Sequence, residues 1–257
     1  MNRTLFILST LLTVSAVKAQ PKEAAGKSPW GPDDEIGTLN MMTEASQLQA
    51  LSKISSGEVF DLSVDYFVGM PSFHALGDPG YQYWLTHTPH GTIVDNPNGL
   101  GREMNEKVSY TGDAISMYTH MGTHIDALNH FGLNGEIWNG FTPEEYLGDK
   151  GWKKTGAETI PPIIARGVLL DIQAALGALP ANYRITSEDI QKTLKKQKVS
   201  LRKGDVVLIR TGQAKYYEDA GHYLDNYPGI SLDAVKWMVE EQEIMLLGAD
   251  NLSFEAF

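Results

Sequence analysis

Cysteine is absent from the 257-residue chain. The chain therefore forms no disulfide, and a thiol nucleophile or a cysteine-ligated zinc site is excluded. Positive charge is scarce, because 21 Lys and Arg stand against 32 Asp and Glu and give a formal net charge of −11. Without a Lys/Arg run, such a chain repels phosphate backbones and anionic membranes. We therefore expect neither nucleic acid nor a membrane as a partner of the mature protein.

Long apolar runs are missing after the first twenty residues. Arg3 precedes a mostly apolar stretch over residues 5–14, and Val17-Lys18-Ala19 has small or tolerated residues where a signal peptidase reads. The stretch is short for a membrane-spanning helix. We predict a signal peptide over residues 1–19, a flexible lead-in over 20–29 and a secreted or periplasmic mature protein. A retained N-terminal anchor is the alternative.

Length and a hydrophobic content of 42% suit one globular domain, over residues 30–257. Thr43 can cap a helix that runs to about Ile54, and the alternation in residues 60–64 predicts a half-buried strand. Residues 69–102 are rich in Pro, Gly, Asn and aromatics, which predicts long binding loops with short strands at most. Their aromatic residues, Tyr81, Tyr83 and Trp84, would either line a pocket or form a small satellite core.

The second half of the chain alternates more regularly. Strands are predicted at residues 168–172, 206–209 and 244–247. One intervening helix opens at a capping box from Thr186 to Asp189. Another opens at Ser231, with its inward face made by Ala234, Val235, Met238 and Val239. This order predicts an α/β domain.

Residues 120–131 hold three of the seven histidines, in the run His-Met-Gly-Thr-His-Ile-Asp-Ala-Leu-Asn-His-Phe. In an extended segment, His120, His124, Asp126 and His130 would emerge on one side, with Gly122 leaving room between them. Two imidazoles and a carboxylate suit a divalent ion such as zinc or manganese, whose open positions acidify a water. His130 is either a fourth ligand or, as we favour, a proton shuttle. A polar loop of hydrogen-bonded histidines without metal is the simpler alternative.

The run resembles the signature His-x-Gly-Thr-His-x-Asp-x-Pro-x-His of the cyclase-type metal hydrolases, which include kynurenine formamidases (arylformamidases) and isatin hydrolases. Leu128 replaces the proline of the signature. Weaker similarity lies at residues 30–40, 203–212 and 248–250. The identical positions are His120, Gly122, Thr123, His124, Asp126 and His130.

The resemblance implies a swivelling β/β/α fold with a barrel-like central sheet flanked by helices, and a homodimer. It also implies that His120, His124 and Asp126 bind one or two metal ions and that His130 is the proton donor and acceptor. Formamidases of this family use a later His and Glu, which would follow the matched segment. The chain ends before such positions, so we expect a C-terminal truncation.

The expected activity is hydrolysis of amide bonds of the arylformamidase type, which belongs to tryptophan catabolism. The substrate would be a small aromatic amide or lactam, and we expect Tyr83, Trp84 and His87 to contact it. One alternative keeps the site and opens a lactam of the isatin type or another cyclic amide or ester. Alternatives of another class are a periplasmic metal-binding protein without catalysis and a structural metal site in a ligand-binding module.

Overall fold

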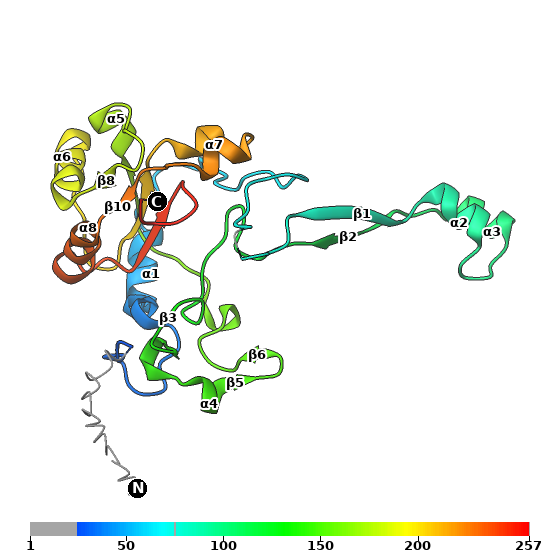
Figure 1. Ribbon diagram of the computed structural model, residues 1–257, viewed down its shortest axis with the longest axis horizontal. Coiled ribbons are helices and arrows are strands. Elements are labelled where there is room, and N and C mark those ends of the chain that lie inside the picture. The colour runs from blue at the N-terminus through cyan, green and yellow to red at the C-terminus, as the bar shows by residue number, and fades with distance from the viewer. Residues whose placement is uncertain (1–24, 75, 257) are drawn as a thin grey trace, which may run out of the picture.

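A three-stranded parallel sheet organises the second half of the chain in the computed structural model, which describes residues 25–74 and 76–256 (Figure 1). Its order is β11-β9-β7, so β9 is central. Leu208 of β9 pairs with Leu169 of β7 and with Gly248 of β11. The bounds are Gly167–Asp171 for β7, Val206–Arg210 for β9 and Leu246–Ala249 for β11. The predicted α/β organisation is therefore confirmed.

Buried aliphatic side chains hold the sheet to its helices. Val207 and Ile209 of β9 and Leu170 of β7 are at most 1% exposed. They belong to one core with Ile190 and Leu194 of helix α6. Burying each such side chain contributes roughly 1.5–3 kcal/mol. The alternation in these strands thus marks the face that meets the helices.

Helix α6, Ser187–Gln197, begins as the sequence predicts. The Thr186 hydroxyl accepts a hydrogen bond from the Asp189 backbone N–H, and the Asp189 carboxylate accepts one from the Thr186 N–H. Ser231 precedes helix α8 without a side-chain capping bond. Val239, predicted to face inward, is 42% exposed, because the chain passes there into a π-helical turn that rotates the side chain outward.

The other elements of this half are short. Helices α5, α6 and α8 gather on one side of the sheet in Figure 1. The bounds are α5 Ile172–Leu176, β8 Arg184–Ile185, η4 Gln213–Tyr216, α7 Ala220–Leu224, β10 Gly229–Ile230, α8 Leu232–Lys236 and η5 Trp237–Glu241.

The first half opens with η1, Gly37–Met41, and helix α1, Glu44–Leu51, which Thr43 caps as predicted. The strand predicted at residues 60–64 is wrong. Phe60 and Leu62 are 71% and 64% exposed, and no strand of the described residues pairs with this segment. Alternation alone does not make a strand when its backbone finds no partner.

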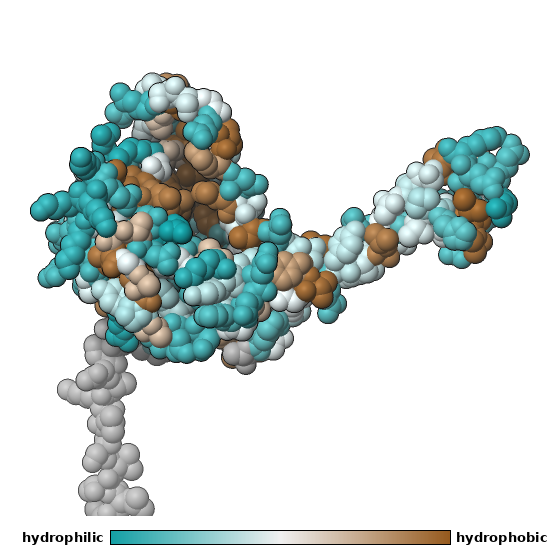
Figure 2. Space-filling model, turned by 90° about the horizontal axis from the view of Figure 1, so that it is seen from above, coloured by the Kyte–Doolittle hydropathy of each residue, from teal (hydrophilic) through white to brown (hydrophobic). Residues whose placement is uncertain are grey.

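A two-stranded arm projects from the body (Figures 1 and 2). Strand β1, Gln82–His87, pairs antiparallel with β2, Gly112–Ser116, and the register shifts between Leu85 and His87. Two short helices lie at its far end, α2, Pro89–Asp95, and α3, Arg102–Lys107. The region predicted as long loops therefore holds regular structure in its second part.

Between the arm and the parallel sheet the chain forms short turns and hairpins. Their bounds are β3 Gly132–Leu133, β4 Glu136–Ile137, η2 Trp138–Gly140, α4 Pro143–Tyr146, β5 Leu147–Gly148, β6 Gly151–Trp152 and η3 Ala157–Thr159. Within residues 25–74 and 76–256 the sheets have two or three strands and none closes. The barrel-like central sheet stays a prediction.

The predicted signal peptide and the first residues of the lead-in lie outside the described residues. Within the described ranges, no helix is both long and apolar enough to span a bilayer.

Candidate metal centre

The histidine-rich run forms an irregular loop that follows β2 and ends where β3 begins. The expected straight, extended segment is wrong, because the backbone bends at Gly122, which has a φ of +65°. This left-handed conformation is open to glycine and strained for other residues. The bend, and not side-chain parity along a strand, brings the ligand candidates together.

Tyr66 holds this bend from outside. A Cβ on Gly122 would lie 2.8 Å from the Tyr66 ring, and the Tyr66 hydroxyl donates to the Met121 carbonyl at 3.1 Å. Thr123 Oγ1 donates to the Leu62 carbonyl at 3.1 Å, so residues 62–66 clamp the loop. The sequence interpretation that Gly122 leaves room between the ligands is therefore incomplete, since the missing side chain makes room for Tyr66. No spacing pattern in the sequence points to Tyr66.

His120, His124 and Asp126 converge on one point. Ligand atoms of these three residues all lie within 4.8 Å of one another. The Asp126 carboxylate accepts from His120 Nδ1 at 2.6 Å and lies 3.2 Å from His124 Nε2. The side chains are 24%, 44% and 29% exposed for His120, Asp126 and His124, so solvent and small molecules reach them. Two imidazoles and one carboxylate at these separations fit a divalent ion with open positions.

Hydrogen bonds set the charge state of two of these groups. Bonding from His124, together with His120, lowers the pKa of Asp126 to about 2 against the opposing effect of burial. The bond to Asp126 raises the pKa of His124. His124 Nδ1 donates to the Gly122 carbonyl at 3.0 Å, which leaves Nε2 as its ligand atom in the neutral ring.

His130 lies against His120. Their rings stack with centroids 3.5 Å apart and planes inclined by 16°, and the backbone N–H of His130 donates to the Ala127 carbonyl at 3.0 Å. Burial, followed by the nearby His120, lowers the pKa of His130. A neutral imidazole beside the ligand cluster can accept a proton and return it.

The predicted substrate residues lie on β1 of the arm. Tyr83 donates to Asp113 of β2 at 3.4 Å, Trp84 pairs with Ala114, and the His87 ring contacts Tyr110. The structure shows them in contact with their own hairpin and does not join them to the histidine cluster. The other histidines are also separate from it: His74 donates to the Asp78 carbonyl, His90 lies in α2, and His222 stacks on Tyr216.

The opening block packs beside the loop. Asp34 accepts from Ser28 Oγ at 2.6 Å and Trp138 Nε1 at 3.3 Å. A Cβ on Gly37 would lie 3.1 Å from Leu128, the residue that replaces the proline of the signature. Residues 34–37 thus pack against the end of the candidate metal loop, residues 120–131.

The other matching blocks meet at the carboxyl ends of two strands. Thr211, after β9, donates from both its N–H and its hydroxyl to Asp250 Oδ1, after β11, at 2.7 Å. Gly212 N–H donates to the other carboxylate oxygen at 2.9 Å. Asp250 therefore links the end of β9 to the end of β11, and residues 211–212 form a structural turn there.

A family model described as "Putative cyclase" matches residues 60–256. The chain belongs to the cyclase family. Among curated relatives, Cyclase-like protein 1 of Arabidopsis thaliana is 28% identical over 188 residues, 69% of this chain, and the match spans only 64% of that relative's length. Cyclase-like protein 1 of Oryza sativa subsp. japonica is 23% identical over 259 residues, which covers 100% of this chain and 79% of the relative.

Solved structures share the fold of this cyclase-family chain. A crystal structure described as a novel cyclase has a TM-score of 0.79 at 28% identity, over 91% of this chain and 79% of the other. Isatin hydrolase A from Ralstonia solanacearum has a TM-score of 0.55 at 20% identity, over 84% and 74%. An isatin hydrolase bound to the product analogue thioisatinate gives 0.54 at 21% identity, over 84% and 76%.

Proposed function

We propose that this chain is a metal-dependent hydrolase of carbon–nitrogen bonds in small aromatic amides, with an arylformamidase (kynurenine formamidase)-like reaction. The observation that carries the proposal is the convergence of His120, His124 and Asp126 within 4.8 Å, with His130 stacked on His120. Membership of the cyclase family and the solvent exposure of the three ligands support it.

His120, His124 and Asp126 would hold one or two ions of zinc or manganese. A divalent ion supplies Lewis-acid polarisation of the substrate carbonyl and lowers the pKa of a water. Asp126 stays ionised over the whole physiological range, because its pKa is about 2. Because His124 Nδ1 is held by the Gly122 carbonyl, Nε2, which lies 3.2 Å from Asp126 Oδ1, would be the atom that holds the ion.

His130 performs the proton transfers. Its lowered pKa favours the neutral ring near pH 7, so it can accept a proton from the attacking water. The protonated ring then donates to the leaving nitrogen, which would otherwise depart as a high-energy anion. The Asp126 carboxylate stabilises this charged form, since it favours protonation of His130.

A second candidate is lactam opening of the isatin type. The fold similarity to isatin hydrolases favours it. The chemistry at the chain's own residues is the same, with attack on an amide carbonyl and proton return to its nitrogen. The two candidates differ in the product: a formamide yields a separate amine and formate, whereas a lactam yields one molecule that carries both the carboxylate and the amine.

Hydrolysis of N-formylkynurenine and of isatin tests both candidates. The chain is freed of metal with a chelator, supplied with zinc or manganese, and compared with its His124→Ala variant. We expect metal-restored turnover of one substrate and none in the variant. Stoichiometric metal binding without turnover of either substrate would contradict the proposal and favour a metal-binding role.

We also propose that the protein is exported and forms a homodimer. The N-terminal pattern of residues 1–19 supports export, and mass spectrometry of the secreted chain should find Gln20 at its N-terminus. The end of the arm exposes Val94, Leu100 and Val108 at 61–65%, a set of apolar side chains that a second subunit would cover. Brown patches mark the arm in Figure 2.

A further inference from the structure

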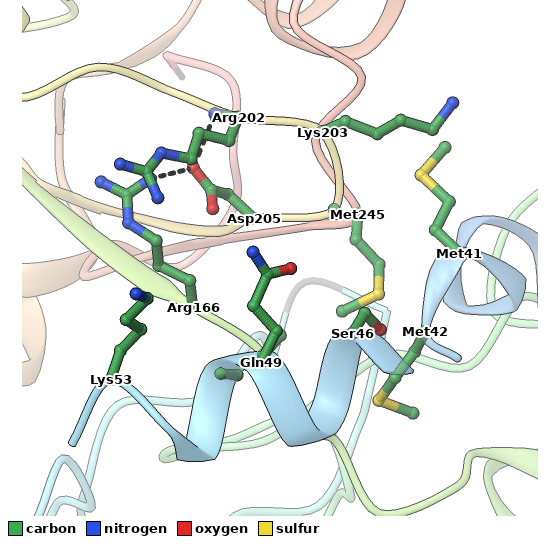
Figure 3. A pocket seen from close by; sticks show the side chains of 13 residues that line it. Met41, Met42, Ser46, Gln49, Lys53, Arg166, Arg202, Lys203, Asp205 and Met245 are labelled. Carbon is green, nitrogen blue, oxygen red and sulfur yellow. Dashed lines mark hydrogen bonds and ion pairs between the residues drawn. The ribbon is translucent and has the colours of Figure 1, made fainter. Parts of the chain in front are cut away.

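A cavity of about 300 Å³ lies between helix α1 and the starts of the three parallel strands (Figure 3). Arg166 precedes β7, residues 202–205 precede β9, and Met245 precedes β11. The cavity is therefore at the end of the strands opposite to Thr211 and Asp250. None of the ligand candidates of the metal centre lines it.

Basic side chains outnumber acidic ones in the lining of this cavity. The basic lining residues are Lys53, Arg166, Arg202 and Lys203, against a single carboxylate, Asp205. Asp205 is 2% exposed and accepts from Arg166 Nη1 at 2.7 Å and from the Arg202 N–H at 2.8 Å. Lys203 pairs with Glu243, outside the cavity lining. In a chain of net charge −11, the charges of Lys53 and Arg202 make a local positive site.

Three methionines contribute apolar surface to the lining. In the view of Figure 3, Met41, Met42 and Met245 lie on the side away from Lys53 and Arg166. Methionine side chains are flexible and polarisable, and they adapt to compact apolar or aromatic groups.

The position of α1 keeps this space open. Thr38 Oγ1 donates to the Met245 carbonyl at 2.8 Å, and the Ile164 N–H contacts Met42 Sδ at 3.2 Å. Both contacts fix the chain just before the helix. The helix itself buries none of its residues, and it presents Ser46, Gln49 and Ala50 to the cavity. The side of α1 that faces the cavity carries small or polar side chains, which do not fill it. The space between the helix and the strand starts is therefore open to a ligand.

We propose that this cavity is a second binding site, for a small organic anion that carries a carboxylate on a compact apolar body. Lys53 and Arg202 would face the carboxylate, and the three methionines would contact the body. The volume suits such a ligand, since sites for small molecules start at roughly 300 Å³. The proposal does not depend on the reaction at the metal centre.

Benzoate is the probe, and the full chain with methyl-labelled methionine is the reporter. We expect benzoate to shift the NMR signals of Met41, Met42 and Met245, which Met→Leu variants assign. Acetate and inorganic phosphate both carry negative charge without the apolar body that the methionines would contact, so both should bind more weakly than benzoate. Unshifted signals of these three methyl groups, or equal binding of acetate or phosphate, would overturn the proposal.

Charge variants locate the anion. Lys53→Gln and Arg202→Gln should each weaken benzoate binding by at least about tenfold, since each variant loses a hydrogen bond between a charged donor and the carboxylate. Arg184→Gln on β8 removes the same charge away from the cavity and should leave the affinity unchanged. An equal loss in Arg184→Gln would show that the affinity follows the net charge of the protein and not a local site. Loss of the benzoate shifts in His124→Ala would place benzoate at the metal centre. Either result would overturn the proposed cavity site.

Discussion

The His130 ring lies 3.5 Å from the His120 ring, centroid to centroid, and nearly parallel to it. His120 donates through Nδ1 to Asp126, so the stack joins a ligand candidate to the group that we propose moves the proton. Two protonated rings at this distance repel each other, which is one cause of the lowered pKa of His130.

His130→Ala should retain metal and lose turnover. General acid–base groups contribute about 10²–10⁴-fold to rate, so kcat should fall by that factor while metal content by mass spectrometry stays unchanged. His222→Ala removes a histidine that also stacks on an aromatic ring, Tyr216, and should leave both properties as they are. Loss of metal in His130→Ala would instead make His130 a ligand.

His124→Ala should lose metal and activity together. Groups that only support ligands typically cost about 10–100-fold in metal affinity, so removal of a ligand should cost at least the upper end of that range. Zinc titration against a competing chelator measures the affinity. A variant that keeps both zinc and turnover would contradict the assignment of His124.

Gly122→Ala should distort the candidate metal loop through a steric clash as well as through backbone strain. The new Cβ would meet the Tyr66 ring at 2.8 Å, in addition to the roughly 1–3 kcal/mol that a positive φ costs a non-glycine residue. Gly135→Ala is the matched control, because Gly135 has a φ of +91° and open space around the Cβ position. Metal affinity should fall in Gly122→Ala alone, and an equal loss in the control would argue against the clamp by Tyr66.

Glu35 should make stability depend on acid pH. Lys154 Nζ donates to Glu35 Oε1 at 2.8 Å, and this bond, with the Thr155 N–H, lowers the pKa of Glu35 from 4.5. A carboxyl group whose pKa is lower in the folded than in the unfolded state stabilises the protein at pH values above its unfolded-state pKa. This stabilisation is lost as the pH falls through its folded-state pKa. Glu35→Gln should therefore unfold in less urea than the parent chain at neutral pH, with a smaller difference at about pH 3. Glu58→Gln, at an exposed position, is the control and should show no such convergence.

The homodimer predicts that the arm is sensitive to charge. Leu100→Asp and Val108→Asp would bury a carboxylate in the proposed interface and should shift the mass measured by light scattering toward the monomer. Leu232→Asp, on α8 of the body and 69% exposed, should leave the mass unchanged. A monomeric parent chain at micromolar concentration would contradict the proposed assembly.

The predictable parts of the fold depend on neighbours in sequence. The capping box of Thr186 and the apolar run of β9 each lie within a few residues, and both are as predicted. The candidate ligands were equally predictable from the sequence, because His120, His124 and Asp126 are close neighbours in one loop. By contrast, the alternation at residues 60–64 carries no information about whether another strand lies beside it to pair with.

The missed parts depend on long-range contacts. Tyr66 lies 55 residues before the Met121 carbonyl to which it donates, and no local pattern encodes that bond. Likewise, the aromatic residues Tyr83 and Trp84 belong to a strand whose partner begins at Gly112. Composition indicated a binding loop there, while the pairing of distant segments made an arm.

The arm leaves and re-enters the body at one place, since Gln82 is paired directly with Ser116. The intervening 33 residues, 83–115, therefore join the body only through this one pair of chain ends, whatever their length or sequence. Evolution can lengthen, shorten or exchange this segment without altering the parallel sheet or the metal loop. The proposed assembly surface and the proposed reaction site thus lie in separate parts of the chain, and insertions and deletions among cyclase-family relatives should concentrate between α2 and α3.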